Sequence, residues 1–126
     1  MKTVINTNNA PAPIGPYSQA IIAGNFVFVS GQVAIDPSSG ELILDDIKTE
    51  TKQVMENIKA ILVEAGIDFS DIVKTSIFLK DMQNFAVVNE VYGTYFKDQF
   101  PARETVQVAG LPKNVNVEIT VTAIKP

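Results

Sequence analysis

Two residue types that carry much of enzyme chemistry are missing from this chain of 126 residues, which has no cysteine and no histidine. Without cysteine there is no disulfide, no thiolate nucleophile and no thiolate metal ligand. Without histidine there is no imidazole base, no Ser-His triad and no His-ligated metal. Asp, Glu, Tyr, Lys or water must therefore carry any acid–base chemistry. The acidic residues also lack calcium-loop spacing, so we expect no metal site.

Positive charge is scarce as well, since 10 Lys and Arg against 14 Asp and Glu give a net charge of −4. No cluster of Lys and Arg suited to phosphates is visible, so we expect no nucleic-acid partner. No apolar run approaches a membrane span, and the first nine residues lack the apolar segment of a secretory signal. These features favour a cytoplasmic protein without a membrane partner, folded as a single domain over residues 1–126.

Alternating apolar and polar residues near the end of the chain predict two strands, over residues 103–108 and 115–122. If these strands pair as an antiparallel hairpin, the register that keeps every valine on the core side sets Thr105 opposite Glu118. Arg103 then lies diagonally across from Glu118 on the non-core face, about 7–8 Å away. A cation and a carboxylate on one polar surface form a candidate site, although such a pair is usually a surface ion pair.

The rest of the chain predicts two helices and further strands. The first helix begins at Asp45 or Asp46 and runs to Ala65, with Gly66 as its stop. The second begins at Asp81 or Asn84 and ends before Pro101. We expect strands over residues 3–6, 21–23, 26–35 and 72–79, with a two-residue turn at 24–25 and a proline-rich loop over residues 8–16.

This order of elements predicts an α+β fold with one mixed sheet. Right-handed crossovers would place both helices on one face and leave the other face bare, with Arg103 and Glu118 on it. The run Phe26–Val29 is apolar on both sides of its strand. That pattern indicates either oligomerisation through the sheet or a central strand covered by a loop.

Several motifs spread along the chain match one known family. They are Gly15-Pro-Tyr-Ser-Gln-Ala20, Val29-Ser-Gly-Gln32, and Pro101-Ala-Arg103 with Leu111-Pro112 and Val117-Glu-Ile119. Each motif is weak alone, but together, in this order and at this chain length, they resemble the RidA family, also called YjgF-like, of enamine/imine deaminases.

The resemblance implies a chorismate-mutase-like α+β fold that forms a homotrimer, with an active site in each cleft between subunits. It implies hydrolysis of 2-imino acids, such as 2-iminobutanoate and 2-iminopropanoate, to 2-keto acids and ammonia. Because reactive imines already hydrolyse in water, such an enzyme needs orientation and one base, and we expect no cofactor.

Site roles follow from the same resemblance. The arginine that binds the substrate carboxylate is expected at Arg103, and the glutamate that holds the water is expected at Glu118. The other expected substrate-binding positions are Tyr17, Ser30, Gly31, Gln32 and Thr105.

Three positions depart from the family pattern. Thr105 stands where many relatives carry cysteine, and Gly110 replaces a longer residue, which could alter substrate preference. Glu104 follows the arginine where small residues are common, but on a strand its side chain should point away from the face of Arg103.

Two other functional classes remain open beside the deaminase. A trimer that only binds keto acids would need Arg103 but no base, so Glu118 discriminates against it. A protein-interaction module would expose an apolar patch and tolerate the loss of Arg103. A ribonuclease role is disfavoured by the acidic balance and the missing histidine.

Overall fold

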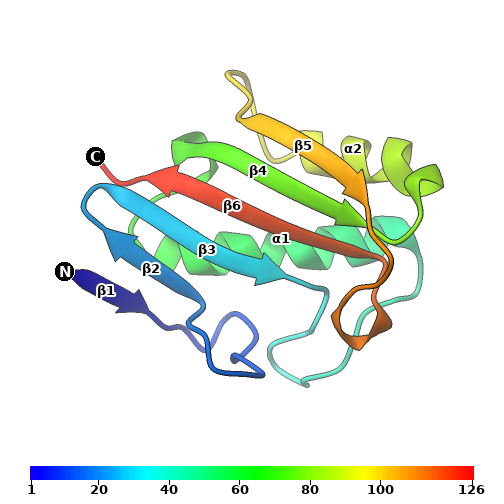
Figure 1. The fold of residues 1–126 in the computed structure, drawn as a ribbon, viewed down its shortest axis with the longest axis horizontal. Helices are drawn as coiled ribbons and strands as arrows, with labels where there is room; N and C mark the ends of the chain where they lie inside the picture. Colours follow the sequence, from blue (N-terminus) through cyan, green and yellow to red (C-terminus); the bar gives the residue numbers. More distant parts are fainter.

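The computed structural model describes all of residues 1–126 and builds one six-stranded sheet with two α-helices (Figure 1). Three short 3-10 turns complete the secondary structure. In chain order the elements are β1 (Lys2–Ile5), β2 (Ala20–Ala23), β3 (Phe26–Gln32), α1 (Ile47–Glu64), η1 (Phe69–Asp71), β4 (Ile72–Leu79), η2 (Met82–Asn84), α2 (Phe85–Gly93), β5 (Ala102–Gln107), η3 (Pro112–Asn114) and β6 (Val117–Ile124).

The strand order in the sheet is β1-β2-β3-β6-β4-β5, so the last strand lies in the middle. The predicted closing hairpin is therefore wrong. Strand β6 pairs antiparallel with both β3 and β4, whereas β5 pairs in parallel with β4 and forms one edge of the sheet (Figure 1). The segment after β5 contains η3 and crosses the end of β4, where Val108 donates to the Leu79 carbonyl and Lys80 to the Asn116 carbonyl.

Helix α1 begins and ends where its capping residues predict. The Asp46 carboxylate accepts a hydrogen bond from the Thr49 amide at 2.7 Å, which identifies Asp46 rather than Asp45 as the N-cap. Gly66 follows the C-cap with φ of +78°, a conformation that glycine adopts without strain. The Lys125 ammonium donates to the Ala65 carbonyl at 2.6 Å and so also satisfies the end of the helix.

Helix α2 is entered through η2. Asp81 caps η2 by accepting from the Gln83 amide at 2.9 Å, and Asn84 stands at the N-cap of α2 without a capping hydrogen bond from its side chain. Each of the two predicted helix starts therefore marks a boundary: Asp81 begins the 3-10 turn η2, and Asn84 begins helix α2.

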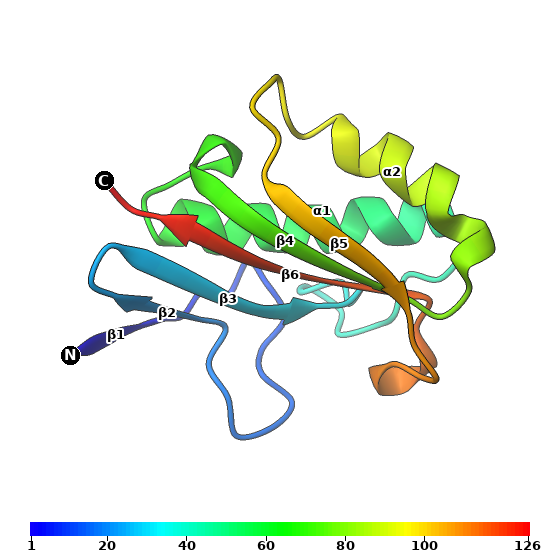
Figure 2. The same ribbon diagram turned by 45° about the horizontal axis from the view of Figure 1, so that its top comes forward.

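Both helices pack on one face of the sheet, which confirms the predicted layers (Figures 1 and 2). A cluster of 22 buried residues fills the space between the helices and the sheet. It joins the apolar stripe of α1 to the buried faces of the central strands, with Val88 and Tyr92 contributed by α2. None of the helices is both long enough and apolar enough to cross a membrane.

The opposite, open face of the sheet carries apolar side chains that nothing in the chain covers. Phe26 and Phe28 are 48% and 47% exposed, whereas Val27 and Val29, which alternate with them, are buried. The alternative of a strand covered by a loop of the same chain is therefore wrong. The two rings stack with centroids 5.8 Å apart, and Val4 on β1 is also exposed on this face.

Candidate active site

Glu118 is the second residue of β6, on the open face of the sheet and opposite Phe78 of β4. Its buried neighbours, Val117 and Ile119, point to the core, so the alternation of the strand places the carboxylate outside. A cavity of about 300 Å³ forms here from the first loop, β3, η3 and β6. Its lining residues are Ile14, Tyr17, Ser30, Gly31, Pro112 and Glu118.

The Glu118 carboxyl is half-buried, and this burial raises its pKa above the usual value of 4.5. No hydrogen bond or neighbouring cation within the chain offsets that effect. Gly31 is packed directly against this carboxyl, because a Cβ added to Gly31 would overlap Glu118 Oε2. A larger residue at position 31 would therefore displace the Glu118 carboxyl, and glycine avoids this by close approach, with no need for a positive φ.

An irregular register between Val29 and Gln32 gives β3 its shape beside Glu118. Within this bulge, the Ser30 amide donates to the Gln19 carbonyl at 2.9 Å and the Ser30 hydroxyl donates to the Ser18 carbonyl at 2.6 Å. Gln32 is buried and donates to the Ser30 carbonyl at 3.1 Å. Ser30 and Gly31 line the cavity, whereas Gln32 supports the bulge from behind.

Tyr17 reaches the same cavity from the proline-rich loop. Its hydroxyl accepts a hydrogen bond from the Ile14 amide at 3.2 Å, which closes a tight turn over Gly15 and Pro16. The side chain is 47% exposed, so its ring remains open to a ligand or a partner.

Gln19 holds this loop in place, a role that was not predicted from the sequence. Its side chain is 2% exposed and accepts from the Thr7 amide while donating to the carbonyls of Thr7, Ala10 and Pro11. The composition of the loop indicates the need for such a residue. Prolines have no N–H group, so the carbonyl groups of a proline-rich loop need hydrogen-bond donors from a side chain.

Arg103 lies on the other face of the sheet, so its predicted place on the open face beside Glu118 is wrong. It stands next to Thr75, which in turn stands next to Val121, and both of these are buried toward the helices. The guanidinium lies over the rings of Phe85 and Tyr92 of α2, 5.7 and 5.1 Å from their centroids.

The guanidinium of Arg103 has no carboxylate partner within the chain, whose one ion pair joins Lys74 to Glu104 at 2.8 Å. Glu104 also binds the Ser76 hydroxyl and points away from the face of Arg103, as predicted. A cavity of about 370 Å³ opens beside the guanidinium. Its lining residues are Asn89, Tyr92, Gly93, Phe100, Pro101 and Arg103.

Two hydroxyl groups complete the surroundings of Arg103. Burial raises the pKa of the Tyr92 phenol, and its hydroxyl donates to Thr75 Oγ1 at 3.1 Å. Thr105 follows Arg103 on the same face of β5, and its Oγ1 is buried without a hydrogen-bond partner. A buried hydroxyl without a partner is uncommon and indicates that a further group completes this site.

The structure therefore divides the predicted site residues into two groups. Tyr17, Ser30, Gly31 and Glu118 surround one cavity, whereas Arg103 and Thr105 belong to the opposite face at the edge strand. Within one chain, the cation and the carboxylate do not share a site.

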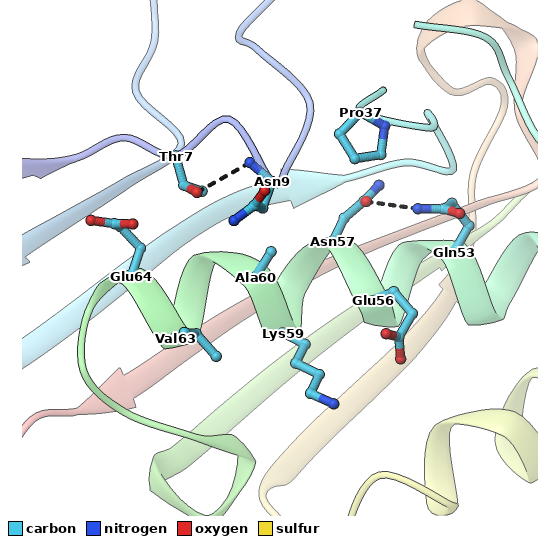
Figure 3. Close-up of a pocket in the computed structure, with 10 residues that line it drawn as sticks. All are labelled: Thr7, Asn9, Pro37, Gln53, Glu56, Asn57, Lys59, Ala60, Val63 and Glu64. Carbon is cyan, nitrogen blue, oxygen red and sulfur yellow. Dashed lines mark hydrogen bonds between the residues drawn. The ribbon is translucent and has the colours of Figure 1, made fainter. Parts of the chain in front are cut away.

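A further hollow of about 380 Å³ lies along the outer side of α1, but none of the predicted site residues lines it (Figure 3). Two hydrogen bonds join polar groups that line it, one from Gln53 to Asn57 at 2.9 Å and one from the Asn9 amide to the Thr7 hydroxyl at 3.1 Å. Asn57 also donates to the carbonyls of Val33 and Ile35. These contacts indicate a structural role for this surface.

Comparison with known proteins gives consistent matches over nearly the full length. The model of the family described as Endoribonuclease L-PSP matches residues 7–125. A RutC family protein of Pyrococcus horikoshii is 57% identical over 125 residues, covering 99% of each chain. A human protein named 2-iminobutanoate/2-iminopropanoate deaminase is 46% identical, covering 99% of this chain and 91% of the human one.

Among solved structures, the crystal structure of E. coli TdcF with bound serine superposes with a TM-score of 0.94. The two chains are 41% identical, and the match covers 98% of this chain and 99% of TdcF.

Proposed function

Because the chain belongs to the Endoribonuclease L-PSP family, also called RidA or YjgF-like, we propose that it is a hydrolase that deaminates 2-iminobutanoate and 2-iminopropanoate. The family resemblance seen in the sequence motifs is thereby confirmed. The observation that carries the function is the full-length similarity to a mammalian protein that bears this activity as its name.

Arg103 is suited to bind the carboxylate of such a substrate. A guanidinium pairs with a carboxylate through two parallel hydrogen bonds and keeps its charge at all relevant pH values. Arg103 has no acidic partner in its own chain, and the flanking rings of Phe85 and Tyr92 limit its movement. A serine bound to TdcF carries the same α-carboxylate group, which is consistent with a site for small amino-acid derivatives in this fold.

Glu118 is suited to act as the base. In the proposed reaction, water adds to the carbon of the protonated imine while the Glu118 carboxylate takes a proton from that water. Glu118 then gives this proton to the nitrogen, and the C–N bond breaks so that ammonia leaves. The Glu118 carboxylate takes the remaining hydroxyl proton as the carbonyl of the keto acid forms, and it releases that proton to solvent. The raised pKa brings Glu118 closer to the pH of the reaction, which favours both proton transfers.

The remaining predicted residues shape the space around this reaction. Gly31 leaves room for the Glu118 carboxyl, and Ser30 and Tyr17 line the same cavity. Gln32 supports the Ser30 carbonyl from behind, and we assign it an indirect role. Thr105 would offer its unpartnered hydroxyl beside Arg103.

We propose that the complete site forms between copies of the chain in a homotrimer. Arg103 comes from the edge strand β5 of one copy, and Glu118 comes from the open face of the next. Two observations support this arrangement: the exposed phenylalanines on the open face and the separation of the two groups within one chain. A repeated contact between unlike surfaces closes into a ring, and three copies give three equivalent sites.

A keto-acid-binding trimer without turnover is the principal alternative, and the placement of Glu118 argues against it. Binding alone gives no reason to keep a half-buried carboxyl, without any hydrogen bond, in a substrate-sized cavity. The family description names an endoribonuclease, but this chain has a net charge of −4 and no histidine. The cytoplasmic location and the single domain over residues 1–126 remain predictions from the sequence.

A coupled assay tests the proposed function. A threonine dehydratase generates 2-iminobutanoate in the presence of semicarbazide, which traps the free imine, and the yield of keto acid is compared with the yield of trapped imine. We expect the wild type to divert imine to keto acid, and Arg103→Ala and Glu118→Gln to lose this effect while remaining folded. A wild type that leaves the trapped fraction unchanged, also with the serine-derived imine, would reject the hydrolase.

A further inference from the structure

Glu50 is the one acidic residue that is completely buried in the chain, with 0% of its surface exposed. It lies in the first turn of α1, between the helix and the sheet. Both carboxylate oxygens are used: Oε2 accepts from the Asn116 amide at 2.8 Å and from the Val117 amide at 3.2 Å. Oε1 accepts from the Asn116 side-chain amide at 2.7 Å.

These three hydrogen bonds reach Asn116, directly before β6, and Val117, its first residue, which precedes Glu118. The Asn116 carbonyl is held as well, because it accepts from the Lys80 amide at 3.0 Å. Every hydrogen-bonding group of Asn116 except its side-chain oxygen is thus engaged with α1 or with the end of β4. Glu118 follows two residues later, on a strand whose direction this attachment sets.

The turn that leads into β6 gives a reason why such an attachment is needed. Lys113 and Asn114 adopt positive φ values of 55° and 59°, which are uncommon for residues other than glycine. Pro112 in the same turn lines the cavity of Glu118. Without the hydrogen bonds to Glu50 after this turn, the chain could enter β6 in more than one position. Pro112 and Glu118, which line the cavity on either side of the turn, would then both move.

A buried carboxylate is an expensive way to obtain stability alone, because its desolvation offsets much of what its hydrogen bonds contribute. The effect of the Glu50 carboxylate on geometry is more specific, because it fixes the positions of two consecutive backbone amides and one side-chain amide. Placement of the catalytic carboxylate is a role that can explain this arrangement.

We propose that Glu50 is a positioning residue for the deaminase reaction, acting through Asn116 and Val117 to place the Glu118 carboxylate and the Pro112 wall of the cavity. The inference rests on the proposed function for its kinetic consequence, but its structural part can be measured without turnover.

The experiment compares Glu50→Ala, Glu50→Gln and the wild type at a temperature well below their unfolding transitions. Alanine leaves the amides of Asn116 and Val117 unpaired, so we expect kcat to fall about 10- to 100-fold through misplacement of the base. KM should stay within about twofold, because the substrate carboxylate is bound by Arg103 on another part of the fold. Glutamine should restore most of kcat, since its oxygen can accept from both backbone amides and its NH₂ can donate to a reoriented Asn116 side chain.

Thr51→Val is the matched control. Thr51 is also 0% exposed in the same turn of α1, but its hydroxyl donates only to the Ile47 carbonyl within the helix. We expect this variant to lower thermal stability and to leave kcat unchanged. If Glu50→Ala also lowers only the thermal stability, or if Glu50→Gln is as impaired in kcat as Glu50→Ala, Glu50 is structural and the inference fails.

Amide hydrogen exchange and the NMR signal of the Glu118 carboxyl carbon provide the readout that does not depend on activity. In Glu50→Ala, the amides of Asn116 and Val117 should exchange faster, and the Glu118 signal should shift. In Thr51→Val neither should change. If the wild type is inactive but these changes occur, the proposed function fails while the positioning role stands; if they do not occur, the positioning role is rejected whatever the activity.

Discussion

Arg103 and Glu118 stand on opposite faces of the same sheet, with strand β4 between the strands that carry them. Arg103 pairs with Thr75, and Thr75 pairs with Val121, three residues from Glu118 along β6. An odd separation along a strand places side chains on opposite faces. Two strand spacings and three residues of rise put the two Cα atoms about 14 Å apart.

In a 2-imino acid, the carboxylate carbon is bonded directly to the imine carbon. A single copy of the chain therefore cannot bind the carboxylate through Arg103 and activate water through Glu118 on the same molecule. The proposed chemistry requires at least two copies, and the exposed apolar face and the edge strand provide surfaces on which they can meet.

The contact between Gly31 and Glu118 gives a sharp test of the base. In Gly31→Ala the new Cβ would overlap the Glu118 carboxyl and displace it, so kcat/KM should fall about 10- to 100-fold. Gly110→Ala is the matched control, because its φ is not positive and no atom lies within 4 Å of the new Cβ. Both variants are assayed with the threonine-derived and the serine-derived imine, so that a change in substrate preference at position 110 is distinguished from a loss of turnover. Steady-state kinetics and circular dichroism of both variants decide the outcome, and equal activity in the two would remove Gly31 from the site.

The raised pKa of Glu118 predicts the pH dependence of activity. Glu118 acts as a base in its ionised form, so activity should fall as pH decreases through its pKa. Burial raises this pKa in the free protein, and the acid limb of kcat/KM should therefore lie above the ordinary value of 4.5. A profile of kcat/KM against pH measures it, and a limb at or below the ordinary value would contradict the assignment.

The same pKa shift also affects the stability of the fold. A carboxylate in a salt bridge makes the fold more stable as pH rises, whereas the raised pKa of Glu118 makes it less stable. A folded pKa above the unfolded value means that the folded state holds the proton more tightly. Wild type should lose stability relative to Glu118→Gln as pH rises from 4.5 through the raised pKa, and the difference should be smallest below 4.5. Thermal unfolding of both proteins across this range measures the effect.

The open face predicts how assembly can be broken. Phe28→Asp places a charge among the exposed rings of this face, and a charge is costly to bury in an interface. We expect the variant to run as a monomer in size-exclusion chromatography with light scattering, and to have lost its activity. Val63→Asp on the outer side of α1, where Val63 is 65% exposed, should remain trimeric and active. A trimeric Phe28→Asp would show that the subunits meet elsewhere.

The sequence predicted the elements that local chemistry determines. Helix α1 was found within two residues because Asp46 and Gly66 mark its ends, and β6 was found because its apolar residues alternate. Parity also placed Glu118 on the open face correctly, because Val117, Ile119 and Val121 must all point to one core.

The partner of each strand was not predictable in the same way. Alternation identifies the two faces of a strand but not its neighbour, and β6 pairs with β4, some forty positions earlier in the chain. Val106 was interpreted as a core residue, yet it is 41% exposed on the open face while Arg103 faces the helices. Strand β5 is an edge strand, and its open face is a surface that another copy of the chain could cover. An apolar residue such as Val106 on this strand therefore does not show which face packs against the core of its own chain.

The most direct measurement of the central claim is activity in mixed assemblies of two inactive variants. Arg103→Ala and Glu118→Gln are unfolded together, refolded as a mixture, and assayed against each variant refolded alone. If each site takes its arginine from one copy and its glutamate from the next, random assembly should restore about one quarter of the sites. The proposed site therefore predicts partial recovery of activity in the mixture and no recovery in either variant refolded alone. Mixed trimers that form but remain inactive would contradict it, because both residues would then have to act from the same chain.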